Sequence, residues 1–143
     1  MNAEIIQLPR YTDPRGNLSV VESFKNIPFD IKRVYFTYDV PAGESRADHA
    51  HKELTEVIIA VSGSFTVRLD DGKEIQQYLL NKPYEALMIR PGIWRQLFDF
   101  SSGAVCLVLC SDFFDEEDYI RDFTDFRKFC IARNYWDDTV SRS

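Results

Sequence analysis

Short apolar runs that alternate with turn residues set the strongest limit on how this chain can fold. The runs are rich in β-branched and aromatic side chains, which favour β-strands, and most are too short for a typical helix. Between them lie clusters of Gly, Pro, Asn and Asp that favour chain reversal. The clearest of these reversals are Asp13–Asn17, Ser62–Ser64, Asp70–Gly72 and Arg90–Gly92. The pattern predicts an all-β barrel or sandwich.

The same pattern defines the expected strands and a different C-terminal end. The expected strands are Ile5–Leu8, Leu18–Glu22, Ile31–Val40, Glu56–Ala60, Phe65–Leu69, Ile75–Leu80, Ala86–Ile89 and Val105–Cys110. Residues 115–118 are all acidic, and the apolar residues after them recur at helical spacing. We therefore expect a short helical tail over residues 115–134 that packs on the barrel. We interpret the acidic run as the solvated start of that helix rather than as a metal or partner site.

Length and charge restrict the classes of partner. A chain of 143 residues fits a single domain, here residues 1–143. No apolar run approaches the ~20 residues that a membrane span needs. Met1–Glu4 lacks the features of a signal peptide, so we expect a cytoplasmic protein without a membrane partner. A net charge of -6 disfavours nucleic acid as a partner, and an anionic ligand would need a local cluster of arginines.

His49 and His51 are the only histidines of the chain. On a strand, alternate side chains share a face, so both imidazoles would project into one site, whereas a helix would splay them apart. Each titrates near neutrality, so the pair can transfer protons or, in neutral form, bind a metal. We interpret the two histidines as the centre of a functional site rather than as buried structural residues.

The histidine pair lies within a spacing that resembles the first motif, and part of the second, of the cupin superfamily. The residues that carry this resemblance are Gly43, His49, His51, Glu56, Gly63 and Pro91–Gly92. The resemblance implies a double-stranded β-helix (jelly-roll) barrel with the histidine strand at its mouth. Metal-binding cupins add a third histidine, but that position holds Arg95 here. Because a guanidinium has no lone pair and stays protonated, we expect no metal and no other cofactor. A metal bound by His49, His51 and Glu56 remains the alternative.

A longer match covers nearly the whole chain. It consists of the stretches Arg15–Leu18, Asn26–Tyr35, Arg46–Lys52, Gly63–Ser64, Leu69–Gly72, Pro91–Trp94, Asp99–Gly103 and Tyr119–Arg121. On these residues the chain resembles the sugar-nucleotide 3,4-ketoisomerases of the WxcM-like cupin family. The resemblance implies a metal-free enzyme that converts dTDP-4-keto-6-deoxyglucose into its 3-keto isomer, for the deoxyamino sugars of surface glycans such as lipopolysaccharide. It also implies a homodimer that exchanges N-terminal strands, here residues 1–12.

Three positions vary or depart from the pattern of that family. Members often have Gly where this chain has Ala47 and Gln where it has Glu56, and the residue after Trp94 is His or Arg. Glu56 restores the metal-type motif, whereas Arg95 opposes it. Because Arg95 would face the site, the configuration of the product at carbon 4 stays open.

The chemistry of a 3,4-ketoisomerase assigns roles to four residues. Moving the ketone requires removal of the carbon 3 proton, an enediol intermediate and protonation of carbon 4. A neutral histidine suits this task because its pKa lies near the working pH. His49 is the candidate base, and His51 would relay a proton or protonate carbon 4, although the two could exchange roles. Tyr35 and Arg46 would stabilise the enediolate oxygen.

Substrate binding would use a second group of residues. The expected members are Arg15, Gly16, Arg33, Trp94 and Arg95. The arginines would bind the diphosphate, because their planar fork matches phosphate oxygens, and Trp94 would stack on thymine. Two other classes stay open: an epimerase of dTDP-4-keto sugars, and a cupin that binds a small ligand without turnover or with a metal.

Overall fold

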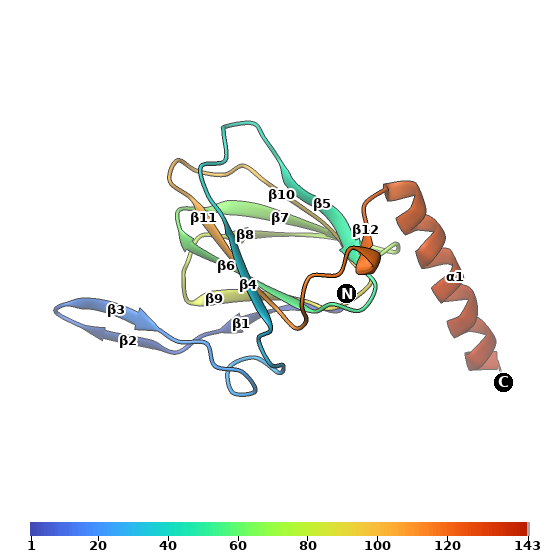
Figure 1. Ribbon diagram of the computed structural model, residues 1–143, viewed down its shortest axis with the longest axis horizontal. Coiled ribbons are helices and arrows are strands. Elements are labelled where there is room, and N and C mark those ends of the chain that lie inside the picture. The colour runs from blue at the N-terminus through green and yellow to red at the C-terminus, as the bar shows by residue number, and fades with distance from the viewer. Residues whose placement is uncertain (143) are drawn as a thin grey trace.

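Two five-stranded antiparallel sheets form the body of the protein in the computed structural model, which describes the backbone of residues 1–142 and the side chains of residues 1–133. In spatial order the first sheet contains β1 (Ala3–Gln7), β9 (Glu85–Ile89), β6 (Glu56–Ser62), β11 (Val105–Cys110) and β4 (Arg33–Thr37). The second contains β12 (Tyr119–Ile120), β5 (Arg46–His51), β10 (Trp94–Phe98), β7 (Phe65–Asp70) and β8 (Ile75–Leu80). Most neighbouring strands are distant in the chain, as in a jelly roll (Figure 1). The all-β expectation is confirmed.

The main core lies between the two sheets and follows the alternation of the strands. On β7, Phe65, Val67 and Leu69 point inward and are fully buried, while the residues between them are partly exposed. They pack against inward residues of the opposite sheet, such as Ile58 of β6 and Val108 of β11. The period of two therefore fixes which side chains can reach the space between the sheets.

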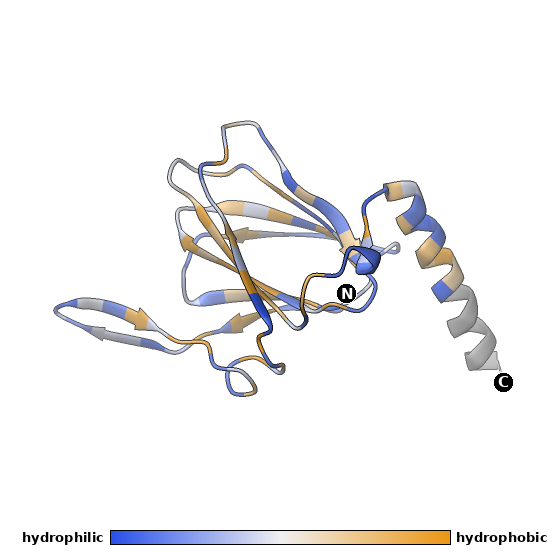
Figure 2. Ribbon diagram, viewed as in Figure 1, coloured by the Kyte–Doolittle hydropathy of each residue, from blue (hydrophilic) through white to orange (hydrophobic). Residues whose placement is uncertain are grey.

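The first sheet is covered on its outer face as well. Val57 and Ile59 of β6 pack outward against Leu8 and Ile27, which belong to the N-terminal segment. Both faces of β6 are buried from Glu56 to Ala60, and its sequence is apolar from Val57 to Val61 (Figure 2). Glu56 is thus a carboxylate at the start of a buried strand.

The N-terminal region contains a strand and a hairpin, and the exchange of residues 1–12 with a second chain stays a prediction. Within this chain β1 pairs with β9, in a register that sets Ile5 opposite Leu87. The segment that projects from the body is the following hairpin of β2 (Arg10–Asp13) and β3 (Gly16–Ser19), all of whose residues are exposed (Figure 1).

The expected helical tail over residues 115–134 is only partly correct. Asp115 caps a single 3-10 turn, η1 (Glu116–Asp118), and the chain then forms β12, which pairs with β5. The helix α1 (Phe123–Arg142) begins only after this strand. Phe126 of the helix packs with Trp94 and Ile120 on the outer face of the second sheet. In the described part of the chain, no helix is long and apolar enough to cross a membrane.

Candidate active site

A cavity of about 510 Å³ opens between the sheets. Its walls come from inward residues of β4, β5, β6, β10 and β11, together with β12. The volume falls in the ~300–1,000 Å³ range of small-molecule sites. Most of the polar residues predicted from the sequence meet here, because the alternation of each strand directs them to the same side.

A bulge in β5 aims the first histidine into this cavity. Ala47 and Asp48 have φ values of 76° and 51°, in the left-handed region that non-glycine residues rarely adopt. The register with β10 shifts at this point, so that Arg95 lies opposite His49 and Gln96 opposite Ala47. Asp48 is therefore the extra residue of a β-bulge, a device that redirects side chains beside functional sites.

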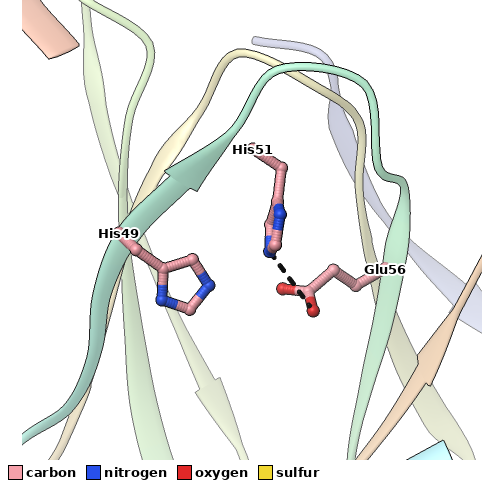
Figure 3. A group of neighbouring side chains, drawn as sticks. All are labelled: His49, His51 and Glu56. Carbon is pink, nitrogen blue, oxygen red and sulfur yellow. Dashed lines mark ion pairs between the residues drawn. The ribbon is translucent and has the colours of Figure 1, made fainter. Parts of the chain in front are cut away.

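The two histidines meet edge to face but differ in access (Figure 3). Their ring centroids are 4.8 Å apart. His49 lines the cavity, whereas His51 is fully buried and packs against the rings of His49 and Tyr119. The Nδ1 of His49 lies 3.0 Å from the carbonyl of Ala47, and a carbonyl can only accept, so this nitrogen carries the proton. Among the described residues, neither Nε2 atom has a hydrogen-bond partner.

Both imidazoles are neutral bases in this environment. Burial and the positive charge of Arg95 lower the pKa of His49 below its usual 6.5. The same two causes lower the pKa of His51 to about 3. The Nε2 atoms therefore carry free lone pairs at neutral pH, as proton acceptors require.

Glu56 and Arg95 form a buried ion pair on the floor of the site. The Nη1 of Arg95 lies 2.5 Å from Oε1 of Glu56, and both side chains are 1% exposed. Tyr35 donates its hydroxyl to the other carboxylate oxygen at 3.1 Å. Burial opposes ionisation of Glu56, but the positive charge of Arg95 and the hydrogen bond from Tyr35 outweigh it and lower its pKa. Burial and the Glu56 charge raise the pKa of Tyr35, so the phenol keeps its proton.

The donor set does not fit a resident divalent ion. His49, His51 and Glu56 do bring their ligand atoms within 4.8 Å of one another. However, Glu56 is bonded to the guanidinium of Arg95 and to Tyr35, and this buried cation repels a second one. Glu56 is therefore already neutralised by a protein group.

Further arginines give the cavity a positive wall in a chain of net charge -6. Arg33, Arg46 and Arg121 all line it. Arg33 donates to the hydroxyl of Tyr119 at 3.2 Å. The Tyr119 ring lies against both histidines, at 4.4 Å from His51 and 5.0 Å from His49 between ring centroids. This cluster supplies the local positive charge that an anionic ligand would need.

Three residues expected at the site lie elsewhere. Trp94 is the neighbour of Arg95 on β10, so it faces the opposite side of the sheet and packs against α1. It cannot share a ligand with Arg95 inside one chain. Arg15 and Gly16 are at the tip of the projecting hairpin, where Arg15 pairs with Asp13 at 2.7 Å. Arg95 itself is in the site but is bound to Glu56, so its placement does not favour a diphosphate role.

Asp118, Tyr119 and Arg121 are the residues that sequence reasoning missed. Asp118 bonds to His51, and the other two line the cavity. Asp118 falls in the acidic run that was expected to be a solvated helix start, and Tyr119 and Arg121 fall in the helical tail expected after it. A strand of two residues has no periodicity, so no pattern could reveal it. The only indication that this stretch is functional was that Tyr119–Arg121 belongs to the residues that carry the family resemblance.

The sequence matches a known family over most of its length. The model of the FdtA family, described as WxcM-like, C-terminal, matches residues 1–131. A TDP-4-oxo-6-deoxy-alpha-D-glucose-3,4-oxoisomerase from Aneurinibacillus thermoaerophilus is 44% identical over 134 residues, which cover 94% of this chain and 96% of that protein.

Solved structures give the same result. A 3,4-ketoisomerase from Thermoanaerobacterium thermosaccharolyticum, solved as a variant with TDP-4-keto-6-deoxyglucose, is 39% identical with a TM-score of 0.90. The match covers 92% of this chain and 96% of that one. A 3,4-ketoisomerase from Helicobacter canadensis is 42% identical, with a TM-score of 0.88 over 91% of this chain and 98% of that one.

Proposed function

This chain belongs to the FdtA family of WxcM-like proteins, and we propose that it moves the keto group of a dTDP-4-keto-6-deoxyhexose from carbon 4 to carbon 3. The observation that carries the proposal is the state of His49: it lines the cavity, its Nδ1 is occupied by Ala47, and its Nε2 has no partner among the described residues. A neutral imidazole in that position is suited to remove a proton next to a ketone.

The reaction balances without an added oxidant or reductant. His49 removes the proton from carbon 3, the electrons of that C–H bond form a double bond to carbon 4, and the carbon 4 oxygen becomes an enolate. This oxygen takes a proton to give an enediol. Loss of the carbon 3 hydroxyl proton then forms the new ketone while carbon 4 is protonated. His51 relays protons between the two oxygens or supplies the proton for carbon 4.

Tyr35 and Arg46 stabilise the negative oxygen of the intermediate. Tyr35 keeps its proton because burial and Glu56 raise its pKa, so it acts as a hydrogen-bond donor rather than as a base. Its hydroxyl would turn from Glu56 to the enediolate oxygen. Arg46 lines the same cavity and adds a positive charge.

The diphosphate is bound by the arginines of the cavity wall. Arg33 is joined here by Arg121, which also lines the cavity and pairs with Glu116 at 2.6 Å. Arginine suits this role because its fork matches phosphate oxygens. Arg95, by contrast, pairs with Glu56 and lies opposite His49, so we do not assign it to the diphosphate.

A second copy of the chain completes the site in this proposal. Arg15 and Gly16 at the tip of the β2–β3 hairpin are far from their own cavity, and the hairpin is exposed throughout. Two molecules that exchange these hairpins would form a twofold homodimer and bring Arg15 to the partner's cavity.

Product analysis separates this function from its alternatives. The protein is incubated with TDP-4-keto-6-deoxyglucose and the sugar is followed by ¹H and ¹³C NMR. The 3-keto isomer is the expected product, and its coupling constants give the configuration at carbon 4. A sugar inverted at carbon 5 with its ketone still on carbon 4 would indicate an epimerase. Unchanged sugar that nevertheless binds would indicate a binding protein.

A further inference from the structure

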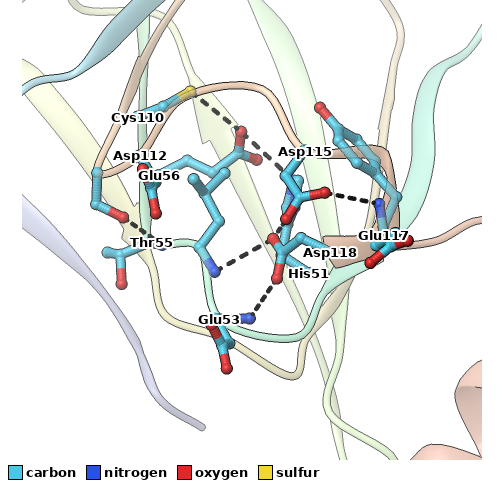
Figure 4. A network of polar contacts seen from close by, with 12 residues as sticks. His51, Glu53, Thr55, Glu56, Cys110, Asp112, Asp115, Glu117 and Asp118 are labelled. Carbon is cyan, nitrogen blue, oxygen red and sulfur yellow. Dashed lines mark hydrogen bonds and ion pairs between the residues drawn. The ribbon is translucent and has the colours of Figure 1, made fainter.

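Asp118 lies behind His51 and is bonded to it (Figure 4). Its Oδ2 is 2.9 Å from Nδ1 of His51, and its side chain is 15% exposed. The same carboxylate accepts the backbone N–H of Glu53 at 2.7 Å and of Leu54 at 3.3 Å. Two backbone N–H bonds from the loop after β5 therefore fix the position and orientation of this carboxylate next to the imidazole.

The contact determines which nitrogen of His51 carries the proton. A neutral imidazole has one N–H and one lone pair. If the proton were on Nε2, the Nδ1 lone pair would face a carboxylate oxygen at 2.9 Å with no hydrogen between them. With the proton on Nδ1, this contact becomes a charge-assisted hydrogen bond. The Nε2 lone pair then points to the side where Glu56 lies, 3.8 Å away (Figure 3).

We propose that Asp118 is a positioning residue of the reaction, which holds His51 in the Nδ1–H tautomer and leaves Nε2 as the atom that receives a proton. The inference rests on the proposed isomerase function. When His51 takes the carbon 3 hydroxyl proton of the enediolate, the Asp118 carboxylate stabilises the imidazolium, and His51 then gives that proton to the carbon 4 oxygen or to carbon 4. Asp118 itself gains and loses no proton.

A purely structural role for Asp118 is the competing explanation. Its carboxylate holds the loop between β5 and β6 through Glu53 and Leu54, and its carbonyl accepts from Lys52 at 3.0 Å. The isosteric variant Asp118→Asn separates the two roles. The amide oxygen can stay with the Glu53 N–H, while the amide NH₂ faces His51 and can only donate. The proton of His51 must then move to Nε2, which removes the proton-accepting atom.

The test reads the tautomer directly. The full chain is labelled with ¹⁵N-histidine, which gives only two imidazoles, and the spectrum of His49→Asn assigns them. We expect the native His51 to carry its proton on Nδ1. Asp118→Asn should carry it on Nε2 and lower kcat by at least ~10²-fold, the usual effect of lost acid-base catalysis, with TDP affinity within a few-fold. Asp115→Asn is the matched control, since Asp115 only caps the 3-10 turn, and should change neither quantity.

Each possible result bears on the inference. An Nε2–H tautomer in the native protein overturns it, and this measurement needs no variant to fold. An Asp118→Asn protein with an unchanged tautomer, or with kcat within three-fold of native, also overturns it. The tautomer is read without substrate, so this test does not depend on activity. If Asp118→Asn switches the tautomer but the native protein never isomerises the sugar nucleotide, the positioning role of Asp118 is supported and only the proposed function is contradicted.

Discussion

At the scale of single residues, the two histidines differ in exposure but depend on each other. His49 lines the cavity, and the buried His51 lies against it with 4.8 Å between ring centroids. We expect His49→Asn to lower turnover by at least ~10²-fold while TDP affinity stays within a few-fold. His51→Asn should also be slow, and the double variant should not show the product of the two losses, since residues that act as a unit are non-additive. Steady-state kinetics and calorimetry test this; a His49→Asn variant with near-native kcat would remove His49 from the mechanism.

The buried histidines also make stability depend on pH. Their pKa values lie below 6.5 in the folded chain, so below pH 6.5 the unfolded chain binds more protons than the folded chain. The free energy of unfolding should therefore decrease as the pH is lowered below 6.5, by up to about 1.4 kcal/mol per pH unit for each histidine. Urea unfolding at fixed protein concentration measures this slope. His51→Asn should reduce it, and equal stability at pH 7 and pH 5 would contradict the assignment of both imidazoles as buried and neutral.

The bulge before His49 stores backbone strain. Ala47 has a φ of 76°, which costs an L-residue about 1–2 kcal/mol, whereas glycine there costs only about 0.5–1 kcal/mol of chain entropy. Ala47→Gly should thus raise the free energy of unfolding by about 0.5–1 kcal/mol. Ala50→Gly, at a buried strand position outside the left-handed region, is the control and should lower it. Denaturant midpoints that move in the same direction for both variants would argue against the strain.

The alternation of strands explains which site residues could be predicted. A period of two put His49 and His51 on one face of β5. Tyr35 was predicted from the family resemblance and Arg33 from the chemistry of diphosphate binding, and both lie on the inward face of β4. Trp94 and Arg95 are adjacent, so the same rule should have separated them; the family resemblance put both in one site. Asp118 could not be found in this way, because it contacts His51 from 67 positions further along the chain, and strand alternation says nothing about such distant contacts.

At the scale of elements, the β2–β3 hairpin carries the predicted link between assembly and binding. Replacing residues 10–19 by a short Gly-Ser turn should give a monomer, because it removes the hairpin that the two molecules exchange. The fold should be retained, because β1 stays paired with β9. Arg15→Ala alone should weaken TDP binding about 10- to 100-fold, the effect of one charge-assisted phosphate contact worth about 1.5–3 kcal/mol.

Matched measurements decide this prediction. Light scattering of the native protein should give about 33 kDa, twice the 16.7 kDa chain. Lys25→Ala removes an exposed positive charge outside the hairpin and should leave TDP affinity unchanged. A native monomer that turns over substrate normally would show that each site is complete within one chain.

Strands were easier to predict than the segments that join them. Seven-residue β6 and the alternating β7 have strong apolar patterns. β10 was missed because Arg95 and Gln96 interrupt its apolar run. The inward arginine is stable there because it pairs with the buried Glu56 and donates to the carbonyl of Ile93. β12 formed where a helix was expected, because pairing with β5 satisfies its backbone and acidic composition gives no information on such pairing.

At the scale of the whole molecule, the fold brings a neutral base, a buried ion pair and a positive wall to one cavity. Length, charge and strand pattern predicted the single all-β domain, and the family resemblance predicted the chemistry. The pairing of β12 with β5 places Tyr119 in the cavity wall, and α1 covers the outer face of the same sheet. Local sequence could not specify these tertiary contacts.

The central claim is that His49 moves a proton through an enediol, and isotope exchange tests it most directly. The native protein and His49→Asn are incubated with TDP-4-keto-6-deoxyglucose in deuterated water and followed by ¹H NMR. With the native protein we expect loss of the carbon 3 proton signal and a 3-keto product that carries deuterium at carbon 4, both at least ~10²-fold slower in His49→Asn. Exchange at carbons 3 and 5 without a 3-keto product, or no exchange at all, would contradict the account.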